Sequence, residues 1–190
     1  MAFGPDTSRP IARGEEAEVD LLLRAAFGGP EEAEIVLRLR ANGDMVAEQV
    51  KPWENRIGAY AAVCRMVQPA GWYCLGPVAV WPEWQNGALW RGDPANPLRN
   101  SMRFGTRLVR TVAELFSTDY RLIPRNLFPG DPPTLVVLGK PAFYTRCGFS
   151  SERAARLTSP FPIRNTLIAR AGDDVPEETL VYPAAFGGLT

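Results

Sequence analysis

The chain has 190 residues, 46% hydrophobic and 22% charged, which predicts a single domain, residues 1–190, with a full core. Histidine is absent, which excludes a Ser-His-Asp triad, a Cys-His dyad and a histidine-ligated zinc, and the three cysteines lack metal-site spacing. We therefore expect no metal. The formal net charge is zero, so neither nucleic acid nor an anionic membrane is expected as a partner. No signal peptide or membrane span is readable, which predicts a cytoplasmic protein.

The first half of the chain predicts two helices and then three strands. Residues 3–10 are rich in turn formers and hold at most a short edge strand. Apolar residues at helical spacing predict a helix over 15–27, and a second helix begins at Pro30 and ends near Asn42-Gly43. Strands are predicted over 45–50, 57–67 and 72–80.

The second half mixes loops, helices and short strands. The pattern predicts a loop over 84–98, a helix over 103–119, a strand over 134–138, a short helix over 139–147, strands over 148–154 and 166–171, and an extended piece over 179–182. Gly148 is expected to end the short helix. This order predicts a mixed α/β fold of the α+β type, a sheet with helices on both faces.

Pro77 lies inside the strongly apolar strand over 72–80. Proline cannot donate a hydrogen bond to a neighbouring strand, so it predicts a bulge or a strand that diverges from its neighbour. A diverging strand leaves backbone groups able to bind a ligand that mimics a strand. The alternative is an edge strand or a bulge without a function.

Arginines recur along the start of the helix over 103–119. Arg99, Arg103, Arg107 and Arg110 have no acidic residue among them, although cations oppose the helix dipole at this end. A bound pyrophosphate or 3′-phosphate would explain them, because helix N-termini bind anions. The alternative is a solvated arginine face in an arginine-rich chain.

Tyr144 lies on the short helix that follows the buried strand over 134–138. That end of a sheet is where open α/β folds place their ligands. A phenol there could protonate a leaving thiolate. The alternative is a tyrosine that packs its ring and bonds a carbonyl.

Three segments together resemble the GNAT-superfamily N-acetyltransferases, in particular the bacterial predicted acetyltransferases. They are GWYCLGPVAVWPEWQ at 71–85, LGKPAFYTRCGF at 138–149 and VYPAAF at 181–186, within a resemblance that covers most of 15–186. The resemblance implies a central, mostly antiparallel sheet of about six or seven strands and the cosubstrate acetyl-CoA. It also implies that Val78, Ala79 and Val80 bind the pantetheine arm and that Tyr144 is the general acid toward CoA thiolate.

The pyrophosphate loop of that family is interrupted in this chain. Gln85 is in place, but Ala88 stands where a glycine is expected, and the pattern resumes after an inserted loop over 86–102. Arg103 replaces one glycine and Gly105 keeps the other. The phosphate-binding residues implied are Arg99, Arg103, Phe104, Gly105, Thr106 and Arg107, with arginine side chains in place of some backbone amides.

The leading hypothesis is an enzyme that moves an acetyl group from acetyl-CoA to a primary amine in a ternary complex. Glu83 is either a base that acts through water or an exposed loop carboxylate. The acceptor is a small-molecule or peptide amine; Phe27, Trp53 and Tyr182 either face its cleft or belong to the core. The alternative function is a non-catalytic binding or dimerisation module, with a possible homodimer through the apolar residues of the insertion.

Overall fold

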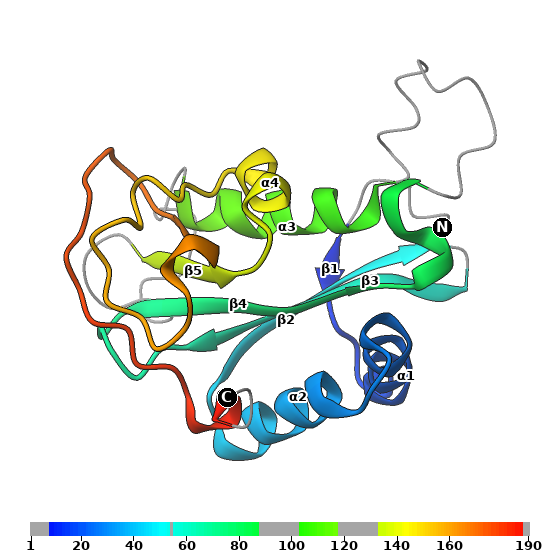
Figure 1. Ribbon diagram of the computed structural model, residues 1–190. Helices are drawn as coiled ribbons and strands as arrows, with labels where there is room; N and C mark the ends of the chain where they lie inside the picture. The colour runs from blue at the N-terminus through cyan, green and yellow to red at the C-terminus, as the bar shows by residue number, and fades with distance from the viewer. Residues whose placement is uncertain (1–7, 54, 88–102, 118–132, 188–190) are drawn as a thin grey trace.

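The structure, a computed structural model, describes residues 8–53, 55–87, 103–117 and 133–187, and it places a β-sheet between two layers of helices (Figure 1). The strands are β1 Arg9–Pro10, β2 Met45–Trp53, β3 Arg56–Arg65, β4 Trp72–Val80, β5 Thr134–Leu138 and β6 Thr166–Ala169. The helices are α1 Glu16–Phe27, α2 Glu31–Asn42, α3 Phe104–Ser117 and α4 Pro141–Tyr144. Helices α1 and α2 cover one face of the sheet, and α3 and α4 lie over the other (Figure 1).

The six strands follow one another in chain order across the sheet, from β1 at one edge to β6 at the other. All neighbours are antiparallel except β4 and β5, which are parallel. A parallel pair needs a crossover connection, and here that connection carries α3 across the sheet. The predicted fold class, a mostly antiparallel sheet with helices on both faces, is confirmed.

Apolar stripes decide which face each helix buries. Val19, Leu22 and Leu23 follow the i, i+3, i+4 spacing on α1 and are fully buried with residues of β3. Phe104 and Leu108 of α3 are equally buried on the opposite face of the sheet. The two faces therefore have separate cores, and both reach β4.

Two glycines end the first pair of helices where the sequence predicts. Gly28 and Gly43 have left-handed backbones, with φ of 77° and 75°, which a residue without a Cβ adopts easily. The N–H of Gly28 donates to the carbonyl of Arg24 at 2.9 Å. The short loop that follows α1 leads directly into α2, so the two helices lie together on one face.

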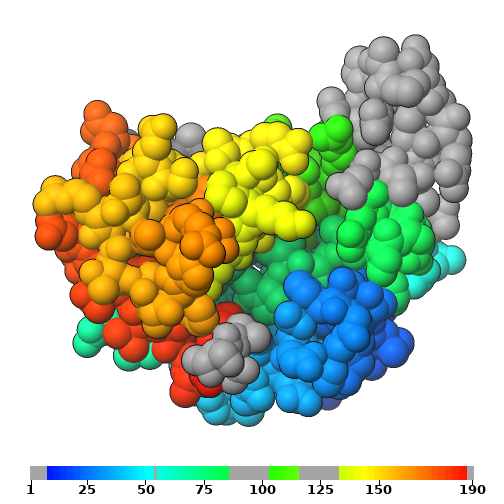
Figure 2. All heavy atoms as spheres, viewed as in Figure 1, coloured from blue at the N-terminus to red at the C-terminus, as the bar shows by residue number. Residues whose placement is uncertain are grey.

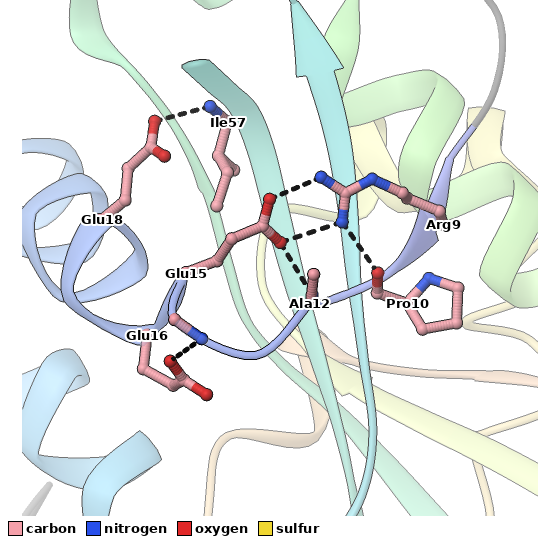
Figure 3. A network of polar contacts seen from close by, with 8 residues as sticks. Arg9, Pro10, Ala12, Glu15, Glu16, Glu18 and Ile57 are labelled. Carbon is pink, nitrogen blue, oxygen red and sulfur yellow. Dashed lines mark hydrogen bonds and ion pairs between the residues drawn. The ribbon is translucent and has the colours of Figure 1, made fainter. Parts of the chain in front are cut away.

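The start of α1 is tied to the sheet by carboxylates (Figure 3). Glu15 accepts hydrogen bonds from the guanidinium of Arg9 in β1 and, at 2.8 Å, from the N–H of Ala12. Glu18 reaches across to accept from the N–H of Ile57 in β3 at 2.6 Å. Acidic groups in the first turn also favour the helix dipole. These contacts fix the position of α1 against the sheet.

The predicted strand over 148–154 is wrong. A single bridge, between Ser150 and Ile168, remains of it. The Ser150 hydroxyl accepts from the N–H of Arg153 at 3.1 Å, and the N–H of Ala154 donates to the carbonyl of Ser151. Serine side chains that bond nearby backbone groups favour turns over strands.

Candidate active site

Strand β4 contains a bulge at the predicted proline. Ala61 of β3 is opposite Val78, whereas Val63 is opposite Leu75, so β4 has one more residue than β3 in this interval. The Gly76–Pro77 peptide bond is cis, and Gly76 has a φ of 151°, a conformation that favours glycine. The irregularity expected from Pro77 is thus confirmed.

Beyond the bulge, β4 and β5 diverge. Their pairing ends with Leu75 opposite Val137, although β4 continues to Val80. Within the described part of the chain, no strand pairs with this edge of β4 between Gly76 and Val80. Backbone groups at such an edge need other partners, which a strand-like ligand can provide.

A cavity of about 480 Å³ opens where the strands diverge. Figure 2 shows the hollow between residues of α1 and α2, in blue, and residues of α4 and the following segment, in yellow and orange. The lining residues are Phe27, Glu32, Ile35, Cys74, Leu75, Gly76, Pro77, Val78, Gln85, Leu138, Gly139, Lys140, Phe143, Tyr144 and Phe186. Val78 therefore lines the cavity, while Ala79 is buried toward α1 and Val80 packs on the α3 side.

Tyr144 lines the same cavity from α4. Its ring lies edge-on to Phe143 and Phe149, with centroids 4.9 Å and 5.7 Å away, and a Cβ on Gly139 would lie 2.4 Å from Tyr144 Cε2. Burial raises the pKa of the phenol well above its ordinary value. A tyrosine held in this way keeps its proton at neutral pH and has it available to donate.

The N-terminal end of α3 lies beside the end of β4. A Cβ on Gly105 would lie 3.1 Å from Val80 Cγ2, so the helix approaches the strand closely at this point. The Phe104 side chain is buried and stacks near Trp53 and Trp84, which leaves its backbone as the part that could bind a ligand. Arg103 precedes the helix, and its buried Nε has no hydrogen-bond partner among the residues that the structure describes.

The other residues expected to bind phosphate differ in their contacts and burial. Thr106 uses its carbonyl to accept a weak hydrogen bond from the Cys147 thiol at 3.8 Å. The Arg107 side chain is partly buried on α3. Arg110 donates to the carbonyl of Arg146 at 2.9 Å. Arg99 and positions 88–102 of the inserted loop lie outside the described residues.

Glu83 lies away from the cavity. It belongs to a short 3₁₀ helix, Pro82–Gly87, and its exposed carboxylate lies 3.9 Å from a guanidinium nitrogen of Arg56. The same guanidinium stacks on Trp81, 4.1 Å from the ring centroid. This geometry gives no support to Glu83 as a base, and that role stays a prediction.

The cavity also contains groups that the sequence did not single out. Glu32, in the first turn of α2, and Phe186, near the C-terminal end, face Tyr144 and β4 across it. Arg38 of α2 donates to the carbonyl of Ala185 at 3.0 Å, which holds Phe186 in place. Of the three aromatic residues considered for the acceptor cleft, Phe27 lines the cavity. Trp53 packs on Phe104, and Tyr182 is buried between Phe161 and Phe186.

Two features are absent from the described residues. These residues contain no group of three or more acidic or cysteine side chains placed to hold a metal ion. None of their helices has the length and apolar character needed to span a bilayer.

Comparisons with known proteins identify the fold. No protein-family model matches the sequence, and no curated protein matches it either. Among solved structures, a GNAT-family N-acetyltransferase from Escherichia coli, YhbS, in complex with CoA, is 22% identical and superposes with a TM-score of 0.71 over 95% of this chain and 91% of that one. A GNAT-family acetyltransferase from Brucella melitensis, in complex with acetyl-CoA, is 24% identical with a TM-score of 0.63, over 95% and 97%. The chain therefore has the fold of the GNAT-family N-acetyltransferases.

Proposed function

We propose that this protein transfers an acetyl group from acetyl-CoA to a primary amine. The observation that carries the proposal is the cavity at the divergence of β4 and β5, which joins an unpaired strand edge to the phenol of Tyr144. The two solved structures with the same fold contain CoA and acetyl-CoA. Bound acetyl-CoA would supply the activated acetyl group as a thioester.

Two features of this chain fit that cosubstrate. The edge of β4 from Gly76 to Val80 offers backbone groups to a pantetheine arm, which is extended and carries amides. The buried Nε of Arg103 has no partner in the described part of the chain, and a phosphate near the start of α3 would provide one. Gly105 lets the start of α3 approach Val80 at the end of β4, which supports assigning both features to one cosubstrate.

Tyr144 is the group we assign to proton donation. Its pKa lies above the ordinary value because the ring is buried, so the phenol is protonated at neutral pH. In the transfer the C–N bond to the amine forms and the C–S bond of the thioester breaks. The nitrogen releases one proton to solvent, the departing thiolate takes one from the phenol of Tyr144, and solvent restores the phenol. The edge-on rings of Phe143 and Phe149 hold the phenol in a fixed orientation.

Calorimetric titration with acetyl-CoA, followed by assays of CoA release with a panel of amines, tests the proposal. We expect binding by the native chain and turnover with at least one amine. Tyr144→Phe should retain the fold and the acetyl-CoA affinity but lower turnover by about a hundredfold, the usual scale for loss of a general acid. Absence of both heat and thermal shift at millimolar acetyl-CoA would overturn the proposal. Unchanged turnover in Tyr144→Phe would make the tyrosine a packing residue.

A further inference from the structure

We propose that Glu32 binds the amino group of the acceptor, and that the acceptor is a monoamine with an apolar, ring-sized substituent. The inference rests on the proposed acetyl transfer and goes further by naming a recognition residue and a substrate class. It is carried by the composition of the cavity wall on the side of α1 and α2. In Figure 2 that wall lies across the hollow from residues of α4, the helix that contributes Tyr144 to the same cavity.

Glu32 supplies the charge. Among the described residues that line the cavity, it is the one with a carboxylate. Lys140, the other charged lining residue, is exposed. The Glu32 side chain is partly buried, and no described arginine or lysine forms an ion pair with it. A partly buried carboxylate is more stable with a cation nearby, and an ammonium group entering the cavity provides one.

The neighbouring acids of α2 are both exposed, unlike Glu32, and one of them has an ion-pair partner. Glu34 pairs with Arg38 one turn later, at 3.7 Å, and Glu31 is exposed to solvent. Glu32 instead lies on the side of α2 that buries Ile35 and Leu39. An acidic residue at the start of that buried side points to a role beyond solubility or the helix dipole.

The rest of the wall is apolar. Phe27 ends α1 and keeps 45% of its surface exposed, which is high for a phenylalanine beside a cavity. Phe186 and Ile35 are nearly fully buried and line the same cavity as Glu32. A polyamine or an aminoglycoside would leave several charges or hydroxyls without partners here, whereas a single amine on an apolar ring would place its one charge against Glu32.

The first experiment measures binding without acetyl-CoA. The full chain is titrated with 2-phenylethylammonium, with 2-phenylethanol as a neutral probe of similar shape, and with spermidine. We expect the monoamine to bind about ten- to a hundredfold more tightly than the alcohol, because a hydrogen bond to a charged group is stronger than a neutral one. Spermidine should bind more weakly than the monoamine.

Matched variants assign the effect to one residue. Glu32→Gln keeps the size of the side chain and should abolish the preference for the monoamine over the alcohol. Glu32→Asp, which keeps the charge, should retain part of that preference. Glu31→Gln removes a charge from the same first turn, outside the cavity, and should leave the preference unchanged. Thermal unfolding of each variant checks that the chain remains folded.

The outcomes separate this inference from the proposed function. Equal binding of amine and alcohol by the native chain, a preference for spermidine, or equal losses in Glu31→Gln and Glu32→Gln would overturn the role of Glu32. A native chain that binds the monoamine through Glu32 but never acetyl-CoA would retain the inferred site and refute acetyl transfer. Where both ligands bind, Glu32→Gln should raise KM for the amine at least tenfold and leave the acetyl-CoA affinity unchanged.

Discussion

Arg103 is the residue that distinguishes the two functional hypotheses, acetyl transfer from bound acetyl-CoA and a non-catalytic module. The resemblance to the GNAT pyrophosphate loop implies a glycine at this position, and the buried Nε of Arg103 has no partner within the described structure. A polar group in that state is costly unless a ligand satisfies it. We therefore favour a site in which the arginine contacts a CoA phosphate over one in which it blocks the cofactor.

Substitution of Arg103 distinguishes these cases. Arg103→Gly restores the family pattern and removes a charge, so a site that uses the arginine should bind CoA more weakly, by about 1.5–3 kcal/mol. Arg103→Ala should do the same, and Arg110→Ala, whose side chain bonds the carbonyl of Arg146, should not. Calorimetry with CoA measures all three. Tighter binding in Arg103→Gly would show that the side chain obstructs the site, and no binding by any form would leave the non-catalytic module.

At the scale of elements, the close packing of α4 against the end of β5 depends on a glycine. Gly139 follows β5 directly, and the Tyr144 ring lies over it so closely that even a methyl group has no room. The sequence therefore sets the position of the phenol through the absence of a side chain five residues earlier. A similar but looser approach occurs between Gly105 of α3 and Val80 of β4.

Gly139→Ala should displace Tyr144. Its Cβ would lie 2.4 Å from Cε2 of the ring, and overpacking of this kind costs about 1–3 kcal/mol. Gly105→Ala serves as the comparison: its contact is 3.1 Å, and alanine favours a helix, so its free energy of unfolding should change less. Chemical denaturation of both variants measures the difference. A Gly139→Ala chain as stable as the native one would mean that the ring moves aside at no cost.

Much of the arrangement of elements was predictable from the sequence, because hydrophobic period and turn residues act locally. Pro77 predicted the bulge since proline has no N–H to donate. Glu32 was missed because an acid in a first turn is ordinary on helix-dipole grounds, and its special feature, a place on the buried side of α2, emerges only once α2 is packed. The predicted strand over 148–154 was wrong because the local hydrogen bond of Ser150 competes with strand pairing.

For the molecule as a whole, the three cysteines lie in different core layers of the fold. Cys147 lies in the core beneath α3, whereas Cys64 and Cys74 are direct cross-strand partners in the core beside α2. All three are free thiols and buried. The contact of Cys64 with Cys74 could not be predicted from the sequence, because it depends on the register of β3 against β4.

Pulsed alkylation should find all three thiols unreactive in the native protein. Burial raises the pKa of Cys147 to about 11, so at pH 8 nearly all of it is protonated, and the thiolate that reacts increases only as pH approaches 11. In denaturant the three sites should become reactive together, as expected of one cooperative unit. Mass spectrometry counts the labels. Rapid labelling of native Cys147 alone would show that the α3 layer opens separately.

The bulge in β4 also constrains how this strand can change in evolution. Side chains alternate between the two faces of a regular strand, yet Leu75 and Val78, three positions apart, both point toward the α3 core. The extra residue therefore reverses, halfway along the strand, which positions point to the α3 face and which to the α1 face. Deleting one residue here would turn Ala79 toward α3 and drive the valines on either side of it into α1. An insertion or deletion of a single residue at this point is thus disfavoured by parity alone, whatever ligand the cavity binds.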